Sequence, residues 1–181
     1  MLINKIIISI IAVLLPLLVA AQSVSVVKEN KQQKFHKQMP AGNYSGVAYL
    51  GNNRYAVVDD KSEDDGYYIF NITIDTITGK ILTVSDEGFV KTSNGNTDLE
   101  GIAYNASQDS VYTIGERNTG KESLTYNEQT HRFWTTTEAP MTEDGKPATP
   151  ENGLTNRMRL KCYDDNMTLV GEYLYEMDKP T

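Results

Sequence analysis

The sequence of 181 residues predicts an all-β fold, and three observations support this prediction. Apolar and polar residues alternate in short runs bounded by turn residues, a pattern typical of half-buried strands. No amphipathic helical pattern follows residue 21. A pair of short strands recurs three times along the chain. The fold is therefore expected to consist of repeated antiparallel strands.

Residues 1–21 predict a cleavable export signal. Lys5 precedes an apolar run, Ile6–Val19, and the small residues Ala20 and Ala21 follow it. This run is shorter than the roughly 20 residues that a membrane-spanning helix needs, and no later segment is apolar enough to span. We therefore expect an exported protein, periplasmic or secreted, without a stable membrane span.

We expect residues 22–40 to form a polar linker and residues 41–181 to form one domain.

The charge of the chain and its single cysteine exclude one class of partner and one kind of covalent link. The formal net charge is −7, and loss of Lys5 with the signal makes the mature chain more acidic. An acidic surface repels nucleic acid, so no nucleic-acid partner is expected. Cys162 is the only cysteine, so no disulfide can form within the chain.

The recurring unit is a strand, a polar turn and a second strand. In the second strand, an aromatic residue stands four positions before an acid. The first strands are Ser45–Tyr49, Glu100–Tyr104 and Glu122–Tyr126, and the pairs in the second strands are Tyr55 with Asp59, Tyr112 with Glu116, and Trp134 with Glu138. A match over two strands and their connection indicates an internal repeat.

The spacing of the repeats predicts an irregular propeller. The first repeat supplies strands 46–50, 54–59, 67–75 and 80–85, which make one four-stranded blade. The third repeat also supplies four strands, which end in a hairpin of 157–163 and 169–177. The second repeat has room for only one hairpin, because the third starts 22 residues after it. We therefore predict a β-propeller-like fold of about two and a half four-stranded blades, a partial propeller.

A partial propeller leaves blade edges open. A closed ring has about four to eight blades, and unpaired edge strands promote association. We therefore expect self-association through open blade edges or completion by a missing C-terminal part. A truncated fragment without a function of its own is the alternative interpretation.

The repeat motifs resemble a known family of exported bacterial propellers. The segments that carry the resemblance are Asn43–Tyr49, Arg54–Asp59, Asp98–Tyr104, Glu122–Tyr126 and His131–Glu138. They look like the family called esterase-like activity of phytase, or phytase-like domain proteins. The resemblance implies a propeller and hydrolysis of phosphate or carboxylic esters. It assigns no catalytic residue, and members of that family are usually about twice this length.

Acidic residues are the main candidates for a site. His36 and His131 are the only histidines, so a zinc site built from two or three histidines is not expected. Equivalent residues of successive blades face one axis, so acids at repeated positions can converge. We expect a Ca²⁺ site, because clustered carboxylates suit that ion. The predicted ligands are Asp59, Glu100, Glu116 and Glu138, with Glu122 equivalent to Glu100. Bonding of these acids to backbone amides between blades is the structural alternative.

Three basic residues lie beside these acids and are candidate phosphate contacts: Lys61, Arg117 and Lys121. Together with a bound cation they predict a metal-assisted hydrolase of phosphate esters that acts on a phosphorylated small molecule. A non-catalytic extracellular propeller that binds a surface or extracellular ligand is the alternative, since propellers host both kinds of function.

Overall fold

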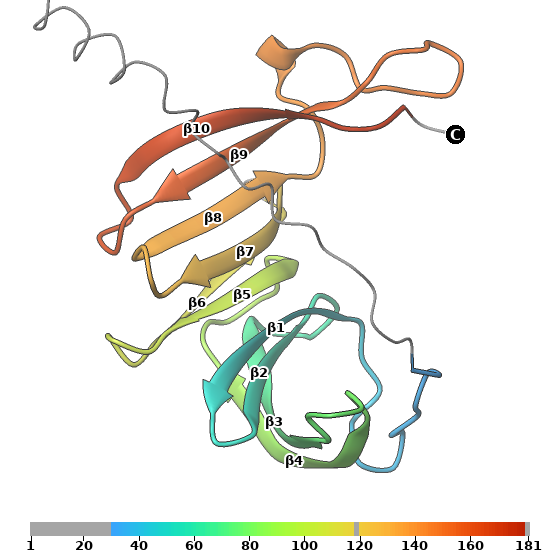
Figure 1. Cartoon of the computed structure of the whole chain (residues 1–181), viewed down its shortest axis with the longest axis vertical. Coiled ribbons are helices and arrows are strands. Elements are labelled where there is room, and N and C mark those ends of the chain that lie inside the picture. The colour runs from blue at the N-terminus through green and yellow to red at the C-terminus, as the bar shows by residue number, and fades with distance from the viewer. Residues whose placement is uncertain (1–29, 118–119, 180–181) are drawn as a thin grey trace, which may run out of the picture. The chain divides into compact units, whose positions relative to one another are not determined.

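The computed structural model describes residues 30–117 and 120–179, and strands dominate this part of the chain (Figure 1). The predicted signal, residues 1–21, lies outside the described residues. Among the described residues the only helical element is a short 3₁₀ helix, η1, so none could span a membrane as a helix. The strands are β1 (Tyr44–Gly51), β2 (Arg54–Asp59), β3 (Gly66–Ile74), β4 (Ile81–Lys91), β5 (Leu99–Asn105), β6 (Ser110–Gly115), β7 (Lys121–Asn127), β8 (Arg132–Thr137), β9 (Arg157–Tyr163) and β10 (Leu169–Glu176), with η1 (Thr142–Asp144) before β9.

The strands form three antiparallel sheets of four, two and four strands. The sheet orders are β1-β2-β3-β4, β5-β6 and β10-β9-β8-β7. This arrangement confirms the all-β, partial propeller-like fold and the two-stranded second unit. Strand β4 extends beyond the predicted 80–85 to Lys91, because it stays paired with β3 as far as Gly66. A bulge next to Gly88, which has a φ of 109°, lets the two strands remain in register.

The first strands of the three repeats pack on one another, β1 on β5 and β5 on β7. A glycine at the same repeat position lets β1 lie close to β5 and β5 lie close to β7. A Cβ atom on Gly46 would lie 3.2 Å from the carbonyl oxygen of Glu100, and one on Gly101 would lie 2.6 Å from the amide nitrogen of Leu124. The third repeat has Ser123 at this position.

Apolar side chains fill the space between neighbouring sheets. A core of five small and branched side chains joins the first and second sheets. Phe133 joins the second and third, since its ring centroid lies 4.6 Å from that of Tyr112 and 4.5 Å from that of Tyr126. The five core residues are Ala48, Ala56, Val58, Leu99 and Ile102. This packing holds the three first strands side by side and so determines where their polar ends lie.

Strand β10 forms the outer edge of the third sheet. It carries exposed apolar side chains, among them Leu174 and Tyr175, which are 60% and 64% exposed. Apolar residues on an unpaired edge favour association. Self-association through this edge remains a prediction.

Candidate functional site

Each repeat has a β-bulge at the same place in its first strand. The pairing with the second strand skips Ser45 in β1, Glu100 in β5 and Glu122 in β7. A bulge bends the strand and redirects the side chain of the extra residue, and bulges are common beside functional sites. The predicted equivalence of Glu100 and Glu122 therefore has a structural basis in a shared bulge.

The second acidic series is also equivalent in the backbone, but with one change. The amides of Asp60, Glu116 and Glu138 donate to the carbonyls two residues before each bulge, over 3.1, 2.8 and 3.0 Å. Asp60, and not Asp59, is thus the residue of the first repeat that is equivalent to Glu116 and Glu138. The reason is that the connection between the first two strands is one residue shorter in the first repeat, where the turn is two residues shorter and a bulge at Leu50 adds one residue. Tyr49 pairs with Tyr55 there, whereas Tyr104 pairs with Val111 and Tyr126 with Phe133.

Asp59 has a role of its own in the backbone. The residue is only 7% exposed, and its Oδ1 atom accepts hydrogen bonds from the amides of Asn43 and Lys61 over 3.0 and 3.1 Å. Asp59 therefore bonds to backbone amides, as the structural alternative predicted, but these amides belong to its own repeat and not to a neighbouring blade. Among the described residues, Asp59 belongs to neither of the carboxylate groups that could hold a metal ion.

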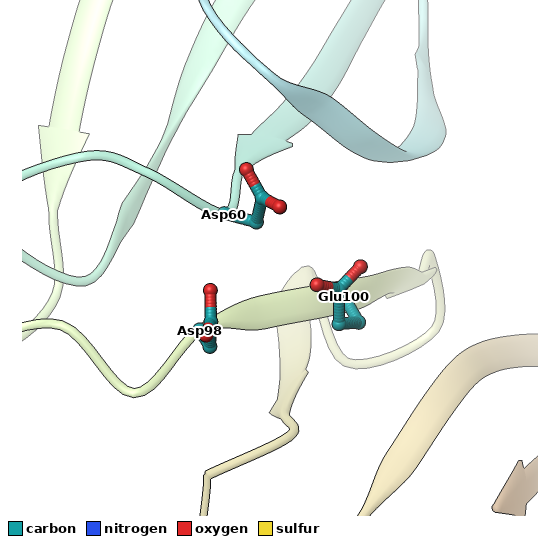
Figure 2. Close-up of side chains that lie close together, drawn as sticks. All are labelled: Asp60, Asp98 and Glu100. Carbon is teal, nitrogen blue, oxygen red and sulfur yellow. The ribbon is translucent and has the colours of Figure 1, made fainter. Parts of the chain in front are cut away.

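A first acidic group lies where the first and second repeats meet. It consists of Asp60 after β2, Asp98 before β5 and Glu100 on β5, and one carboxylate oxygen of each lies within 4.8 Å of the others. Figure 2 shows the three carboxylates around a common space. All three residues are half-buried. Two repeats therefore contribute to one group.

A second acidic group lies where the second and third repeats meet. Glu116 after β6, Glu122 on β7 and Glu138 after β8 also bring carboxylate oxygens within 4.8 Å of one another. Glu116 and Glu122 are half-buried, and Glu138 is exposed. In both groups, the acid that ends one repeat meets the bulge acid of the next.

Lysine and arginine neutralise part of the first acidic group. Lys61 Nζ lies 3.1 Å from Asp60 Oδ2 and 2.9 Å from Asp98 Oδ1, and Arg117 Nε lies 3.6 Å from Asp98 Oδ2. The hydrogen bond from Lys61 is the main reason that the pKa of Asp98 is lowered. Asp60 Oδ1 is buried and has no hydrogen-bond partner among the described residues.

No described lysine or arginine forms an ion pair with the second acidic group. The pKa of Glu116 is raised, mainly by the charge of Glu138. Burial raises the pKa of Glu122 first, and the charge of Glu138 adds to it. Burial also raises the pKa of Glu100, followed by the charge of Glu122, so the two groups influence one another.

The predicted phosphate contacts separate into two places. Lys61 and Arg117 lie at the first acidic group and both contact Asp98. Lys121 lies elsewhere, with its Nζ atom 5.8 Å from the centre of the Tyr163 ring. The candidates that sequence reasoning missed as ligands are Asp60 and Asp98. Asp98 was visible in the Asp98–Tyr104 motif, and Asp60 is adjacent to a predicted ligand.

The two groups suit a hard divalent cation. Ca²⁺ takes six to eight oxygen ligands from carboxylates, carbonyls and water, in flexible geometry. The buried, unpaired Asp60 Oδ1 and the raised pKa values of Glu116 and Glu122 are the features that a bound cation would relieve. The residues present therefore fit Ca²⁺.

Comparison with known proteins identifies the family. A family model described as SdiA-regulated matches residues 27–121, just over half of the chain, which include β1–β6 and the first acidic group. No curated protein and no solved structure matches the chain. The likeness to phytase-like and esterase-like propellers holds at the level of a related family, whereas phytase activity stays a prediction. The chain belongs to the SdiA-regulated family, a β-propeller-like family related to phytase-like and esterase-like proteins.

Proposed function

We propose that the protein binds Ca²⁺ at the junctions between its repeats and uses it to hydrolyse a phosphate ester. The observation that carries this proposal is the convergence of six carboxylates in two groups. Five of them stand at positions related by the repeat, and Asp98 is the sixth. Their negative charge alone would repel a phosphate, so a cation is needed between protein and substrate.

The chain's own residues have separate tasks in this proposal. Asp60 would hold a cation in the first acidic group, and Glu116 and Glu122 would hold one in the second. A bound cation would supply charge stabilisation at the phosphoryl oxygens. Arg117 binds a phosphoryl oxygen, because its side chain is 57% exposed and its guanidinium lies at the edge of the first acidic group. Water provides the oxygen that adds to phosphorus, and the bond to the alcohol breaks.

Glu100 is the candidate for accepting the proton from that water. Burial raises its pKa above the usual range, which is the direction expected of a general base working closer to neutral pH. Glu100 belongs to the first acidic group, and the charge of Glu122 in the second group also raises its pKa. Export to the periplasm or outside the cell would expose the protein to abundant Ca²⁺.

The test combines calcium titration with a phosphatase assay on para-nitrophenyl phosphate. Wild type should bind Ca²⁺ by calorimetry and release nitrophenol, and a chelator should abolish the activity. Glu116→Gln should weaken Ca²⁺ binding about tenfold or more, while Glu151→Gln, in an exposed loop, should leave it unchanged. Absence of Ca²⁺ binding, or phosphatase activity that survives both chelator and Glu116→Gln, would overturn the proposal.

One observation favours a second candidate function, a binding propeller without catalysis. Lys61 and Arg117 both contact Asp98, so each would have to leave that carboxylate to bind a phosphate. Calcium binding without turnover of any phosphate ester would support this second candidate.

A further inference from the structure

Among the described residues, strand β6 lacks the hydrogen-bonded neighbour that the equivalent strands have. β2 pairs with β3 and β8 pairs with β9, whereas the second sheet ends at β6 (Figure 1). Within the described parts of the chain, the backbone of residues 111–114 pairs with β5 alone. An open edge of this kind presents unpaired N–H and C=O groups to any extended chain that approaches.

A pocket of about 230 Å³ lies beside this open edge. Its walls come from β6 on one side and from the third sheet on the other, and they are mainly apolar and aromatic. The pocket is smaller than the roughly 300 to 1,000 Å³ typical of small-molecule sites, so one side chain fills it better than a whole ligand does. The principal wall residues are Tyr112, Ile114, Leu124, Phe133, Thr135 and Tyr163.

Two polar groups interrupt these apolar walls. Thr135 is only 2% exposed, and its Oγ1 atom is buried without a hydrogen-bond partner among the described residues. Lys121 also lines the pocket, with Nζ over the ring of Tyr163. A hydroxyl that can donate and an ammonium group together suit a carboxylate oxygen. A buried polar atom without a partner is uncommon in folded proteins and points to a missing ligand group.

Beyond the pocket, the face of the third sheet that carries Thr135 is charged and needs no apolar cover. Thr135 pairs with Lys161 in the register of β8 and β9, so Lys161 and Arg159 lie on the same face as Thr135. Arg159 pairs with Asp144 at a short distance and with Glu172 over 3.0 Å, and Lys161 Nζ lies 3.6 Å from Glu172. This face is covered by ion pairs, so a single added strand is enough to complete the second sheet locally.

We propose that β6 binds an extended peptide strand from a partner protein, in the position that β3 and β9 occupy in their sheets, with an acidic side chain inserted into the pocket. Main-chain hydrogen bonds to the open edge provide affinity, and the pocket provides specificity, as in other cases of strand addition. Lys121 and Thr135 select the carboxylate by charge and by hydrogen bonding. The neighbouring side chains of the peptide alternate between apolar and polar, as they do in residues 70–74 of β3 and 157–162 of β9.

The test uses a fluorescein-labelled, end-blocked nonapeptide of alternating valine and threonine, with lysine at both ends and one central glutamate. Fluorescence anisotropy should show binding to wild type, and hydrogen exchange should slow at residues 111–114. Thr135→Val should weaken binding about fivefold, the usual effect of one lost hydrogen bond. Thr136→Val, on the opposite face of the same strand, should leave peptide binding unchanged. A peptide with alanine in place of the central glutamate should bind wild type less tightly.

Several outcomes would overturn the proposal. These are no binding of the peptide, equal affinity for the two threonine variants when both melt like wild type, or protection of β4 or β10 instead of β6. Complete competition by acetate or benzoate would indicate a small-molecule site instead. Protection of β6 without peptide, rising with protein concentration, would show that a second copy of the chain covers this edge.

Discussion

The two junctions between repeats share one backbone arrangement but differ in charge. At both, a glycine lets first strands approach, and a bulge acid meets the acid that ends the preceding repeat. The first junction places Lys61 and Arg117 among its acids, whereas the second has no described basic partner for its three glutamates. The repeat therefore decides where acids converge, and the local sequence decides whether their charge is balanced.

The largest expected effect concerns how tightly the first strands pack at the two junctions. Gly101→Ala places a Cβ atom 2.6 Å from the Leu124 amide nitrogen, so β5 and β7 must move apart. We expect it to lower the free energy of unfolding by about 1–3 kcal/mol, the usual cost of overpacking. Gly46→Ala, with its nearest atom at 3.2 Å, should cost less. Urea denaturation of both variants checks this order, and equal losses would mean that the junctions are packed alike.

A smaller effect concerns cation affinity at the first junction. Lys61 occupies two of the three carboxylates there and competes with a divalent cation. Lys61→Met should therefore strengthen Ca²⁺ binding about twofold to fivefold, in the range of an exposed ion pair. Calorimetry measures this, with Lys146→Met in an exposed loop as the control. Weaker binding in Lys61→Met would show that Lys61 organises the acids and does not compete for them.

The smallest expected effect is a difference in pH dependence without calcium. The pKa of Glu116 is raised in the folded state, so its favourable contribution is present at low pH and is lost as pH rises through the folded pKa. Glu116→Gln should raise the melting temperature at pH 7, and the gain should disappear near pH 4.

The pKa of Asp98 is lowered, so its contribution is present above the unfolded pKa and is lost as pH falls through the folded pKa. Asp98→Asn should therefore lower the melting temperature at pH 7, with less effect in acid. Thermal melts across this pH range, at low salt and with chelator, compare the two variants. A shift of the same sign in both would contradict the charge difference between the junctions.

Much of the fold was predictable from local patterns. The alternation in residues 67–75 and the hairpin of 157–163 with 169–177 match β3, β9 and β10 closely. The two-stranded second sheet was predictable from the spacing of the repeats, because the 22 residues between the starts of the second and third repeats hold only one hairpin. The extension of β4 to Lys91 was not predictable, since a bulge at Gly88 interrupts its alternation.

The candidate site was only partly predictable, and Asp59 shows why. Its position after an aromatic residue matches Glu116 and Glu138 by sequence. The turn between β1 and β2 is two residues shorter than the others and a bulge at Leu50 adds one back, so the register moves the equivalence by one residue to Asp60. A shift of one residue turns a side chain to the other face of a strand, and no local pattern reports that shift.

The sequence by itself determined the strand content, the threefold recurrence and the short second unit, because these depend on alternation, turn residues and spacing along the chain. Only the tertiary structure decided which acids share a space, which of them a lysine neutralises, and that β6 keeps an open edge beside a pocket. Those properties depend on register and on contacts between strands distant in sequence. A difference of one residue in the connection between two strands changes which side chain faces the site.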